Sequence, residues 1–472
     1  MFKLQATGHL PIVGIAHKFL GADNVKVYDI IKEIVKPGPV SPKGFWLGPT
    51  LFFFIINDID QVNQTLSSKY CIDRPPFIDL TLQTHGILFA SGEIWKSHRK
   101  MIEPAFNMNI LRSFYPIFNS TANTFIEKLS RNFGKELDIY DLFAPLALQS
   151  ILLTTGIMKQ PDPVINEEYL IHSHILRKAL VEKVSRVWYH WRPLLKYTEM
   201  YNKEQRNLWN GIVRIADDTL REREQQYLNG ELDHLKSVGN KPQIFIDQLY
   251  KQRKQFTYEE ILQEVNTLVI AGFETSTNTF SMIALLSAIF PDVQRKIVEE
   301  QESIFSSADE VVNEEHINQM VYLELVIKEC LRFWPVIPMT MRALSEDLKI
   351  GDFLVPKGTI ILIPIMHIHQ SKKHFGEDAD EFRPERFAPE NLHKINLQAY
   401  MPFSRIPRNC IGHRYAMIII KLMLSYFFRN CKVSTTMKIE NIKFEFTVAC
   451  NSSEGYNVTM EKRNFMPDNN KA

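Results

Sequence analysis

The segment between Thr257 and Pro291 constrains the fold more than any other part of the chain. It begins with a capping box, Thr257-Tyr-Glu-Glu260, in which the threonine hydroxyl is offered to the Glu260 amide and the glutamate reaches back to the helix start. No proline follows before Pro291. The segment is therefore predicted to form one helix of roughly 33 residues, which at about 1.5 Å per residue would reach about 50 Å.

The middle of this predicted helix is its unusual part. Its two ends are apolar, but Ala271 to Thr279 is small and polar, and a central glycine costs about 1 kcal/mol relative to alanine. A carboxylate (Glu274) and a hydroxyl (Thr275) at the midpoint of a buried helix indicate a polar site enclosed by the fold. A solvated face or a kink is the alternative interpretation.

The rest of the pattern predicts a mainly helical protein with a small β portion. It is helical from about Tyr115 to Leu325, apart from a polar stretch, Gln225 to Lys241, that we expect to be a surface connection. Strand-like segments are confined to the two ends of the chain, at 44–56, 348–365 and 442–460. A length of 472 residues alone would suggest about three domains. Strands contributed by both ends instead favour a single interleaved domain, residues 1–472.

Composition excludes several classes of protein. With 45% hydrophobic and 23% charged residues, the chain is not disordered, collagen-like or disulfide-stapled. Its net charge of +1 gives no electrostatic reason to expect a nucleic-acid partner. The longest apolar run, Phe45 to Ile56, is broken by Gly48-Pro49 and is too short to cross a bilayer, so we expect it to form strand. The N-terminus lacks the features of a signal peptide.

One cysteine stands apart from the others. The five cysteines are Cys71, Cys330, Cys410, Cys431 and Cys450. They form no C-x-x-C pair, which favours a reduced compartment, and most of them are expected to be buried thiols. Cys410 follows a proline-containing loop and lies two residues after Arg408, just before an apolar helix predicted from Met417 to Phe427. A thiolate at a helix start is stabilised by the helix dipole. Cys410 is therefore a candidate nucleophile or a candidate axial ligand of an iron porphyrin.

Two further pairs of residues are weak signals when taken singly. Glu329-x-x-Arg332 places a carboxylate and a guanidinium one helical turn apart, and Trp95-x-x-x-Arg99 places an indole and a cation on one helical face. Each pair is as readily explained by an ordinary solvated helix surface. Their value lies in their order along the chain.

Read in order, the motifs resemble those of the cytochrome P450 family of heme-thiolate monooxygenases. The resemblance comprises Trp95-x-x-x-Arg99 as the helix-C motif, Ala271-Gly-x-Glu-Thr275 as the oxygen-activation stretch, Glu329-x-x-Arg332 as the helix-K pair, Pro384-Glu-Arg-Phe387 as the segment with its second arginine, and Phe403-Ser-x-x-x-Arg408-x-Cys410-x-Gly412 as the heme-binding loop. The segment His9 to Gly14 is similar to the family's entry segment. Glu264 to Ser276 resembles the clan-4 pattern, which includes fatty-acid ω-hydroxylases and many insect microsomal enzymes.

This resemblance implies a P450 fold, with the long central helix over the heme, and a role for each matched residue. Cys410 would be the axial ligand of the iron of heme b, and Thr275 with Glu274 would deliver protons to bound oxygen. The expected partners of the heme propionates are Trp95, Arg99, Arg342 and Arg408, since guanidinium groups suit carboxylates. The expected structural triad is Glu329, Arg332 and Arg386. Ala271 cannot form the heme ester that a glutamate at this place forms in some members, so heme held noncovalently apart from the iron–sulfur bond is expected.

The implied reaction inserts one oxygen atom from O₂ into an apolar, lipid-like substrate or xenobiotic and reduces the other to water. A thiolate ligand pushes electron density onto iron and favours O–O cleavage. Electrons would come from NADPH through NADPH–cytochrome P450 reductase, with cytochrome b5 as a further candidate partner, and Arg405 and Arg414 would contribute to a basic docking surface. An isomerase or dehydratase on the same fold, which needs no reductase, is one alternative.

Ile406 departs from the family pattern and motivates a second alternative. Members usually have glycine four residues before the cysteine, whereas this chain has Ile406 followed by Pro407. A β-branched residue resists positive φ and would add bulk near the heme face. Either the loop takes a different path, or heme binding is impaired and the chain is a degenerate, heme-free binding protein.

The expected location is the cytosolic face of the endoplasmic reticulum membrane. Microsomal members usually carry an apolar anchor before the entry segment, and only eight residues precede it here, so we expect peripheral attachment to the membrane surface or a truncated anchor. The four N-x-S/T triplets, at Asn63, Asn119, Asn451 and Asn457, are discounted because a cytosol-facing enzyme would not meet the glycosylation machinery.

Overall fold

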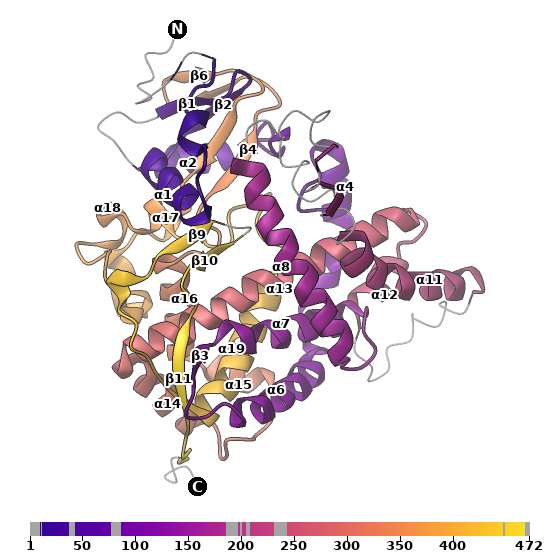
Figure 1. The fold of residues 1–472 in the computed structure, drawn as a ribbon, viewed down its shortest axis with the longest axis vertical. Helices are drawn as coiled ribbons and strands as arrows, with labels where there is room; N and C mark the ends of the chain where they lie inside the picture. Colours follow the sequence, from indigo (N-terminus) through magenta and orange to yellow (C-terminus); the bar gives the residue numbers. More distant parts are fainter. Residues whose placement is uncertain are drawn as a thin grey trace.

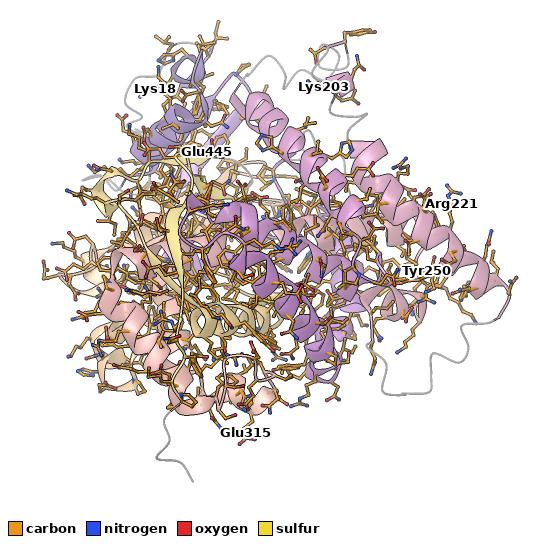
Figure 2. All side chains as sticks on the ribbon, turned by 60° about the horizontal axis from the view of Figure 1, so that its bottom comes forward. Lys18, Lys203, Arg221, Tyr250, Glu315 and Glu445 are labelled. Carbon is orange, nitrogen blue, oxygen red and sulfur yellow. The ribbon has the colours of Figure 1, made fainter. Side chains whose placement is uncertain are left out.

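A computed structural model of the chain describes residue 10 and residues 12–36, 43–76, 86–185, 197–198, 201–203, 208–230, 243–446 and 449–467. A large helical body occupies most of the molecule; small sheets lie at the end beside the N-terminal residues and also toward the C-terminus (Figure 1). Labelled charged side chains such as Lys18, Arg221 and Glu315 lie at the periphery (Figure 2). The helical body and the small sheets together form the mainly α fold with a small β portion that the sequence predicts.

Helix α13, Tyr258–Ile289, runs through the centre of this body (Figure 1). It begins at the predicted capping box, in which the Thr257 amide donates to Glu260 Oε2 at 2.7 Å and the Glu260 amide donates to Thr257 Oγ1 at 3.2 Å. Most of its side chains are buried, and α7, Tyr140–Thr155, packs along it. The prediction of one long, buried helix is confirmed.

The remaining helices surround α13. They are α1 (Asn24–Val35), α2 (Ile59–Ser67), α4 (Gly92–Ile102), α5 (Met108–Arg112), α6 (Tyr115–Ser130), α8 (Pro163–Ser185), α11 (Arg214–Leu228), α12 (Phe245–Tyr250), α14 (Pro291–Ile304), α15 (Glu314–Gln319), α16 (Val321–Phe333), α17 (Ile365–His369), α18 (Lys372–Phe375) and α19 (His413–Asn430). Short 3₁₀ turns include η1 (Ala16–Phe19), η3 (Glu103–Phe106) and η7 (Pro384–Phe387). None of the helices within the described residues is long and apolar enough to span a membrane.

The largest sheet joins strands from distant parts of the chain. Its order is β1 (Lys43–Leu47), β2 (Leu51–Ile55), β7 (Ile360–Ile363), β4 (Thr340–Ala343). The apolar run at 45–56 forms the β1–β2 hairpin, in which Gly48 at φ 67° begins the turn. Strand β2 then pairs in parallel with β7, more than 300 residues later. The sheet is therefore built from both halves of the chain, as the sequence predicts.

The smaller sheets correct the prediction that strands are confined to the chain ends. Their orders are β3 (Glu136–Asp138), β11 (Asn457–Lys462), β8 (Cys431–Ser434); β5 (Leu348–Ile350), β6 (Phe353–Val355); and β10 (Cys450–Ser452), β9 (Phe444–Phe446). Strand β3 lies inside the stretch predicted to be helical. It has three residues and pairs with β11 from the other end of the chain, so the pairing is tertiary and leaves no alternating pattern in the local sequence.

The predicted surface connection at 225–241 is wrong at its start. Helix α11 continues to Leu228, because Glu and Gln are good helix formers even in an exposed helix. The rest of that prediction, 231–241, lies outside the described residues.

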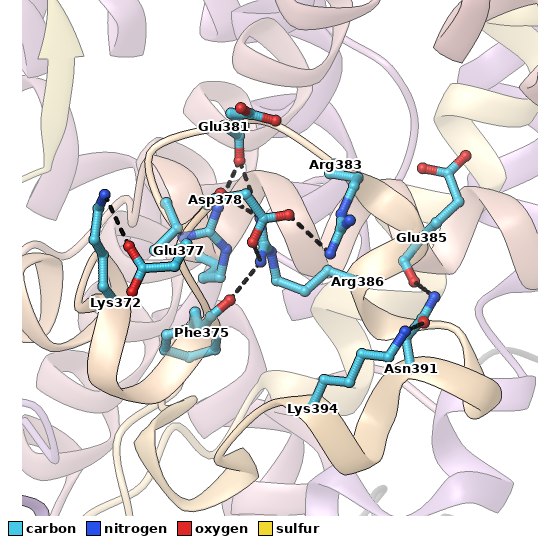
Figure 3. A network of polar contacts seen from close by, with 12 residues as sticks. Lys372, Phe375, Glu377, Asp378, Glu381, Arg383, Glu385, Arg386, Asn391 and Lys394 are labelled. Atoms are coloured by element: carbon cyan, nitrogen blue, oxygen red, sulfur yellow. Dashed lines mark hydrogen bonds and ion pairs between the residues drawn. The ribbon is translucent and has the colours of Figure 1, made fainter.

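A buried ionic network fixes the end of α16. Arg332 donates Nε and Nη2 to the two oxygens of Glu329, both at 2.8 Å. Arg386, on η7, donates to the same carboxylate at 3.3 Å. It also donates to Asp378 at 2.7 Å (Figure 3). The remaining donors of Arg332 and Arg386 are bound by five backbone carbonyls, those of His369, Phe375, Asp378, Ala379 and Glu381. The charges are therefore paired although almost no water reaches them.

Candidate functional site

A cavity of about 530 Å³ lies beside the middle of α13. Its walls come mainly from apolar side chains of α13, the loop before α19, the 86–90 segment and the β1–β2–β7–β4 sheet. Among the charged or reactive groups that line it are Cys410, Thr275, Glu274, Arg342 and Arg408. The structure thus brings together residues that are up to 136 positions apart in the sequence.

The Cys410 loop presents its sulfur to this cavity. The Cys410 amide donates to the Phe403 carbonyl at 2.8 Å, which closes the loop, and α19 begins at His413. Cys410 has exposed surface only because it faces the cavity; the residue itself lies deep in the protein. Burial raises the pKa of the Cys410 thiol, and the Gly412 amide and the Arg99 charge offset this only in part. The predicted stabilisation of the thiolate by the helix start is therefore outweighed by desolvation, and a bound cation would be needed to reverse the balance.

Three arginines concentrate positive charge on one wall of the cavity. Burial, followed by mutual repulsion, lowers the pKa of Arg408 to about 9 and that of Arg74 well below its usual value, while burial lowers the pKa of Arg342 to about 10. The buried Nε of Arg342 has no hydrogen-bond partner among the described residues. An anion in the cavity would offset the mutual repulsion of these cations, and a pair of carboxylates would suit guanidinium groups.

Trp95 and Arg99 support this wall from α4. The Arg408 guanidinium lies over the Trp95 ring, 4.6 Å from its centroid. Arg99 lines the cavity and donates to the Asn409 carbonyl at 2.8 Å and to the Asn409 side chain at 3.2 Å. Arg99 therefore braces the residue that precedes Cys410, a contact that sequence motifs alone did not reveal.

Thr275 and Glu274 lie on the cavity side of α13. The Thr275 hydroxyl donates to the Ala271 carbonyl at 2.7 Å, and this keeps its oxygen close to the helix axis. Glu274 is buried and accepts from the Tyr140 hydroxyl at 3.3 Å, and its other oxygen lies 3.5 Å from the Asn278 amide nitrogen. A polar, enclosed site in the middle of the long helix is what the sequence predicts, and a solvated face is excluded.

Comparison with known families shows what this chain is related to. The sequence model of the cytochrome P450 family matches residues 7–460. The chain belongs to the cytochrome P450 family. Membership implies heme-thiolate monooxygenase chemistry, a heme cofactor, O₂ and a redox partner.

The similar curated P450s come from insects and vertebrates. The chain is 31% identical to "Probable cytochrome P450 4ac1" of Drosophila melanogaster over 80% of this chain and 74% of that protein. It is 27% identical to "Cytochrome P450 4g1" of the same fly, over 98% and 89%, and 28% identical to human "Cytochrome P450 4V2", over 89% and 82%. The predicted resemblance to clan-4 members is confirmed.

The residues around the cavity of this P450 fit a heme. A heme carries an iron that accepts a thiolate and two propionates that accept hydrogen bonds from guanidinium groups. The cavity is lined by Cys410 and by the cations of Arg74, Arg342 and Arg408. Without an anion these three cations would repel one another in a desolvated site, so the donor set matches the group that the family uses.

Ile406 does not obstruct the cavity of this P450. Its side chain is 74% exposed and is not among the lining residues. The left-handed backbone in this loop occurs at Ser404, with φ 58°, rather than at Ile406. The predicted bulk near the heme face is therefore wrong, and the loop follows the alternative expectation of a different path.

Three residues near the site escaped the sequence motifs. Arg74 adds a third cation to the cavity wall, Tyr140 donates to Glu274, and His98 forms a buried pair with Glu264. Their sequence contexts are ordinary: only the three-dimensional neighbours of each residue distinguish it. By contrast, two of the discounted N-x-S/T triplets begin at buried asparagines, Asn119 and Asn451, which agrees with discounting them.

Proposed function

We propose that this P450 hydroxylates an apolar, lipid-like substrate or xenobiotic, inserting one oxygen atom from O₂ while electrons arrive from NADPH through NADPH–cytochrome P450 reductase. The observation that carries the proposal is the cavity itself, which joins the Cys410 sulfur and the Thr275 hydroxyl to a long apolar wall. A volume of about 530 Å³ lies within the usual range for small-molecule sites, about 300–1,000 Å³.

The apolar wall supports the class of substrate. Away from Cys410 the cavity reaches side chains of η1, α1, β1 and β2, among them Phe19, Ile31, Phe45 and Phe53. Burial of an alkyl or isoprenoid chain against them is favourable by about 25 cal/mol per Å² of apolar surface. A charged or strongly polar group in the same place would be desolvated without a partner.

We propose that the cofactor is heme b, held noncovalently apart from the bond between iron and Cys410, because Ala271 offers no carboxylate for an ester. The propionates would contact Arg342 and Arg408, with Trp95 and Arg99 supporting that wall. When bound, the heme supplies the iron at which O₂ is activated, a reaction that a thiolate ligand favours.

The role of α13 is to hold a proton source beside the cavity. We propose that Glu274 takes up protons from the side of Tyr140, and that the Thr275 hydroxyl passes them into the cavity or holds a water there. Both groups line the cavity, and Glu274 accepts a hydrogen bond from Tyr140, which is not among the lining residues. This pair disfavours the isomerase or dehydratase alternative, which needs no proton delivery to oxygen.

The electron donor would bind beside the Cys410 loop. Arg414 and Ile406 are exposed there, and Arg405 beside them is half-buried. We propose that this surface receives the reductase, and cytochrome b5 as a second donor, since an acidic partner surface would complement it.

The sheet end of the molecule supports a location on the cytosolic face of the endoplasmic reticulum membrane. Large apolar side chains are exposed there, including Ile12, Leu20 and Trp46, and their neighbours Phe19 and Phe45 line the cavity. An apolar substrate dissolved in the membrane would then lie close to the end of the cavity. We also propose that residues 1–472 form one domain.

Two measurements test the proposed function. A red-shifted carbon-monoxide band of the reduced protein, as expected for a thiolate ligand, supports heme bound through Cys410; absence of any heme band would support the heme-free binding alternative. NADPH-dependent oxygen consumption with purified reductase and an aliphatic lipid then separates a monooxygenase from an isomerase or dehydratase. Heme binding without oxygen consumption or oxygenated product would contradict the proposal.

A further inference from the structure

A buried ion pair joins α4 to α13 just outside the cavity. His98 Nδ1 lies 2.7 Å from Glu264 Oε1, and the two residues are only 5% and 0% exposed. Glu260, one turn earlier on α13, lies 3.6 Å from His98 Nε2. None of the three residues lines the cavity, so the pair has no direct contact with substrate or cofactor.

Glu264 also holds the main chain of the 86–90 loop. Its second oxygen accepts from the Ile87 amide at 3.0 Å. The neighbouring Gly86 lies so close to α13 that a Cβ there would come within 2.0 Å of Thr267 Oγ1. The loop is therefore docked on α13 by a close backbone approach and by one carboxylate, and that carboxylate is paired with His98.

The main chain of the 86–90 loop also binds two arginines that line the cavity, Arg408 and Arg74. The Arg408 guanidinium donates to the Ile87 carbonyl at 3.0 Å and to the Ala90 carbonyl. Arg74 Nε donates to the Leu88 carbonyl at 3.0 Å. Three carbonyls of this loop, those of Ile87, Leu88 and Ala90, thus orient two of the four arginines that line the cavity.

Electrostatics make the pair sensitive to pH. The hydrogen bond between His98 and Glu264 raises the pKa of His98, and burial raises the pKa of Glu264. The groups facing the imidazole are Glu264 and Glu260 from α13 and the ring of Phe256 before that helix, whose centroid lies 5.1 Å from the imidazole centroid. The 86–90 loop contains no titratable side chain. Loss of the His98 proton leaves a buried carboxylate without its counter-charge, which is strongly unfavourable.

We propose that the His98–Glu264 pair positions Arg408, one of the two proposed propionate partners, and its neighbour Arg74 by anchoring the 86–90 loop, so that heme retention depends on the charge of His98. The inference rests on the proposed binding of heme at Cys410. His98 and Glu264 are positioning residues, since they act on the cofactor only through the loop and its arginines. Because the pKa of His98 is raised, its imidazole keeps its charge to a higher pH than an ordinary histidine, and that charge is lost as the pH rises through that pKa.

The experiment measures transfer of hemin from the holoprotein to excess apomyoglobin between about pH 6 and pH 9, a window that includes and exceeds the ordinary imidazole pKa of about 6.5. The variants are His98→Gln and Glu264→Gln, which retain hydrogen-bonding groups but remove the ion pair. Lys421→Gln is the matched control: Lys421 is also buried and paired, with Glu324 at 2.6 Å, but its contacts lie at α15 and α16. Thermal unfolding of each apoprotein reports the loss of stability separately.

The wild-type rate of hemin loss is expected to rise with pH, whereas His98→Gln should lose hemin about 10- to 100-fold faster at low pH, with no such rise. Lys421→Gln should lower the unfolding temperature without changing hemin loss. A wild-type rate of hemin loss that does not vary with pH would overturn the inference. Equal rates of hemin loss from Glu264→Gln and Lys421→Gln would also overturn it, and neither result would contradict heme binding itself. A wild-type protein without a thiolate-type carbon-monoxide band would instead overturn the proposed function, and the inference with it.

Discussion

Arg408 lies over the indole of Trp95, with its guanidinium carbon 4.6 Å from the ring centroid, while its nitrogens donate to the carbonyls of Ile72, Ile87 and Ala90. Trp95, which the sequence motif predicts to be a direct partner of the heme, thus also supports Arg408. A cation over an indole contributes about 0.5–2 kcal/mol. The stacking keeps the guanidinium plane fixed in a site where the cation is poorly solvated.

Replacing Trp95 by leucine is therefore expected to weaken heme retention. Loss of about 0.5–2 kcal/mol corresponds to hemin dissociation about 2- to 30-fold faster. Trp95→Phe, which keeps an aromatic face, should lie between the wild type and Trp95→Leu. Trp46→Leu is the control, because Trp46 is 43% exposed on β1 and is absent from the cavity wall. Equal hemin loss from Trp95→Leu and Trp46→Leu would contradict the role of the stacked ring.

The proton-delivery role is tested at Thr275. Thr275→Ala removes the hydroxyl that faces the cavity, so a larger share of the oxygen consumed should leave as peroxide and a smaller share as product. Thr277→Ala is a matched control on the same helix: its hydroxyl donates to the Phe273 carbonyl at 2.9 Å and does not line the cavity. The ratio of product to NADPH oxidised gives the answer. An unchanged ratio in Thr275→Ala would count against the role.

Tyr140→Phe tests the outer side of the same path. The change removes the hydroxyl that donates to Glu274 at 3.3 Å, while the ring can still stack against Tyr456. Slower proton uptake is expected, seen as lower coupling and a larger solvent isotope effect on turnover. Tyr169→Phe is the control, since the Tyr169 hydroxyl has no hydrogen-bond partner among the described residues. A similar isotope effect in both variants would show that Tyr140 only packs.

The sequence predicts those features that depend on local chemistry. The capping box at Thr257 and the absence of proline to Pro291 specify α13, because both act within a few residues of chain. Cys410 could be identified because its loop, its neighbouring arginine and its following helix are all contiguous. Apolar alternation likewise locates the β1–β2 hairpin.

Features that depend on distant pairing could not be predicted in the same way. Strand β3 has three residues and owes its conformation to β11, which is more than 300 positions later. Arg74, His98 and Tyr140 are ordinary residues until Leu88, Glu264 and Glu274 are placed beside them. Ile406 illustrates the converse: a local rule predicts bulk at the heme face, but the loop bends at Ser404 and turns the side chain to solvent.

Breaking the buried triad of Glu329, Arg332 and Arg386 is expected to cause a large loss of folding stability. Arg332→Ala leaves the Glu329 carboxylate buried with only part of its counter-charge, at a cost of about 3–5 kcal/mol. Little folded holoprotein should be recovered. Arg383→Ala is the control, because Arg383 is half-exposed and pairs with the same network at Asp378, where a loss below about 1 kcal/mol is expected. Urea unfolding measures both; normal heme binding by Arg332→Ala would refute the triad assignment.

The environment of His369 leads us to expect that the folding stability of this protein decreases in acid. Its imidazole is fully buried, and Nε2 accepts from the Met401 amide at 2.9 Å, which ties α17 to the start of the Cys410 loop. Burial, followed by the nearby Arg332 charge, lowers the pKa of His369 to about 3. The unfolded chain binds a proton near the ordinary imidazole pKa of about 6.5, whereas the folded protein does not. The neutral ring therefore stabilises the fold fully above about pH 6.5, and that contribution is lost as the pH falls toward 3.

The expected loss is about 1.4 kcal/mol per pH unit below about pH 6.5, or about 2 kcal/mol between pH 6.5 and pH 5. Carboxylates also titrate in this range, so the measured quantity is the difference between the wild type and His369→Gln in the free energy of unfolding by urea. A glutamine can accept from the Met401 amide but does not titrate, so its profile should be flatter by that amount. Parallel profiles for the two proteins would mean that His369 becomes protonated without unfolding, and that the Met401 contact does not require the neutral ring.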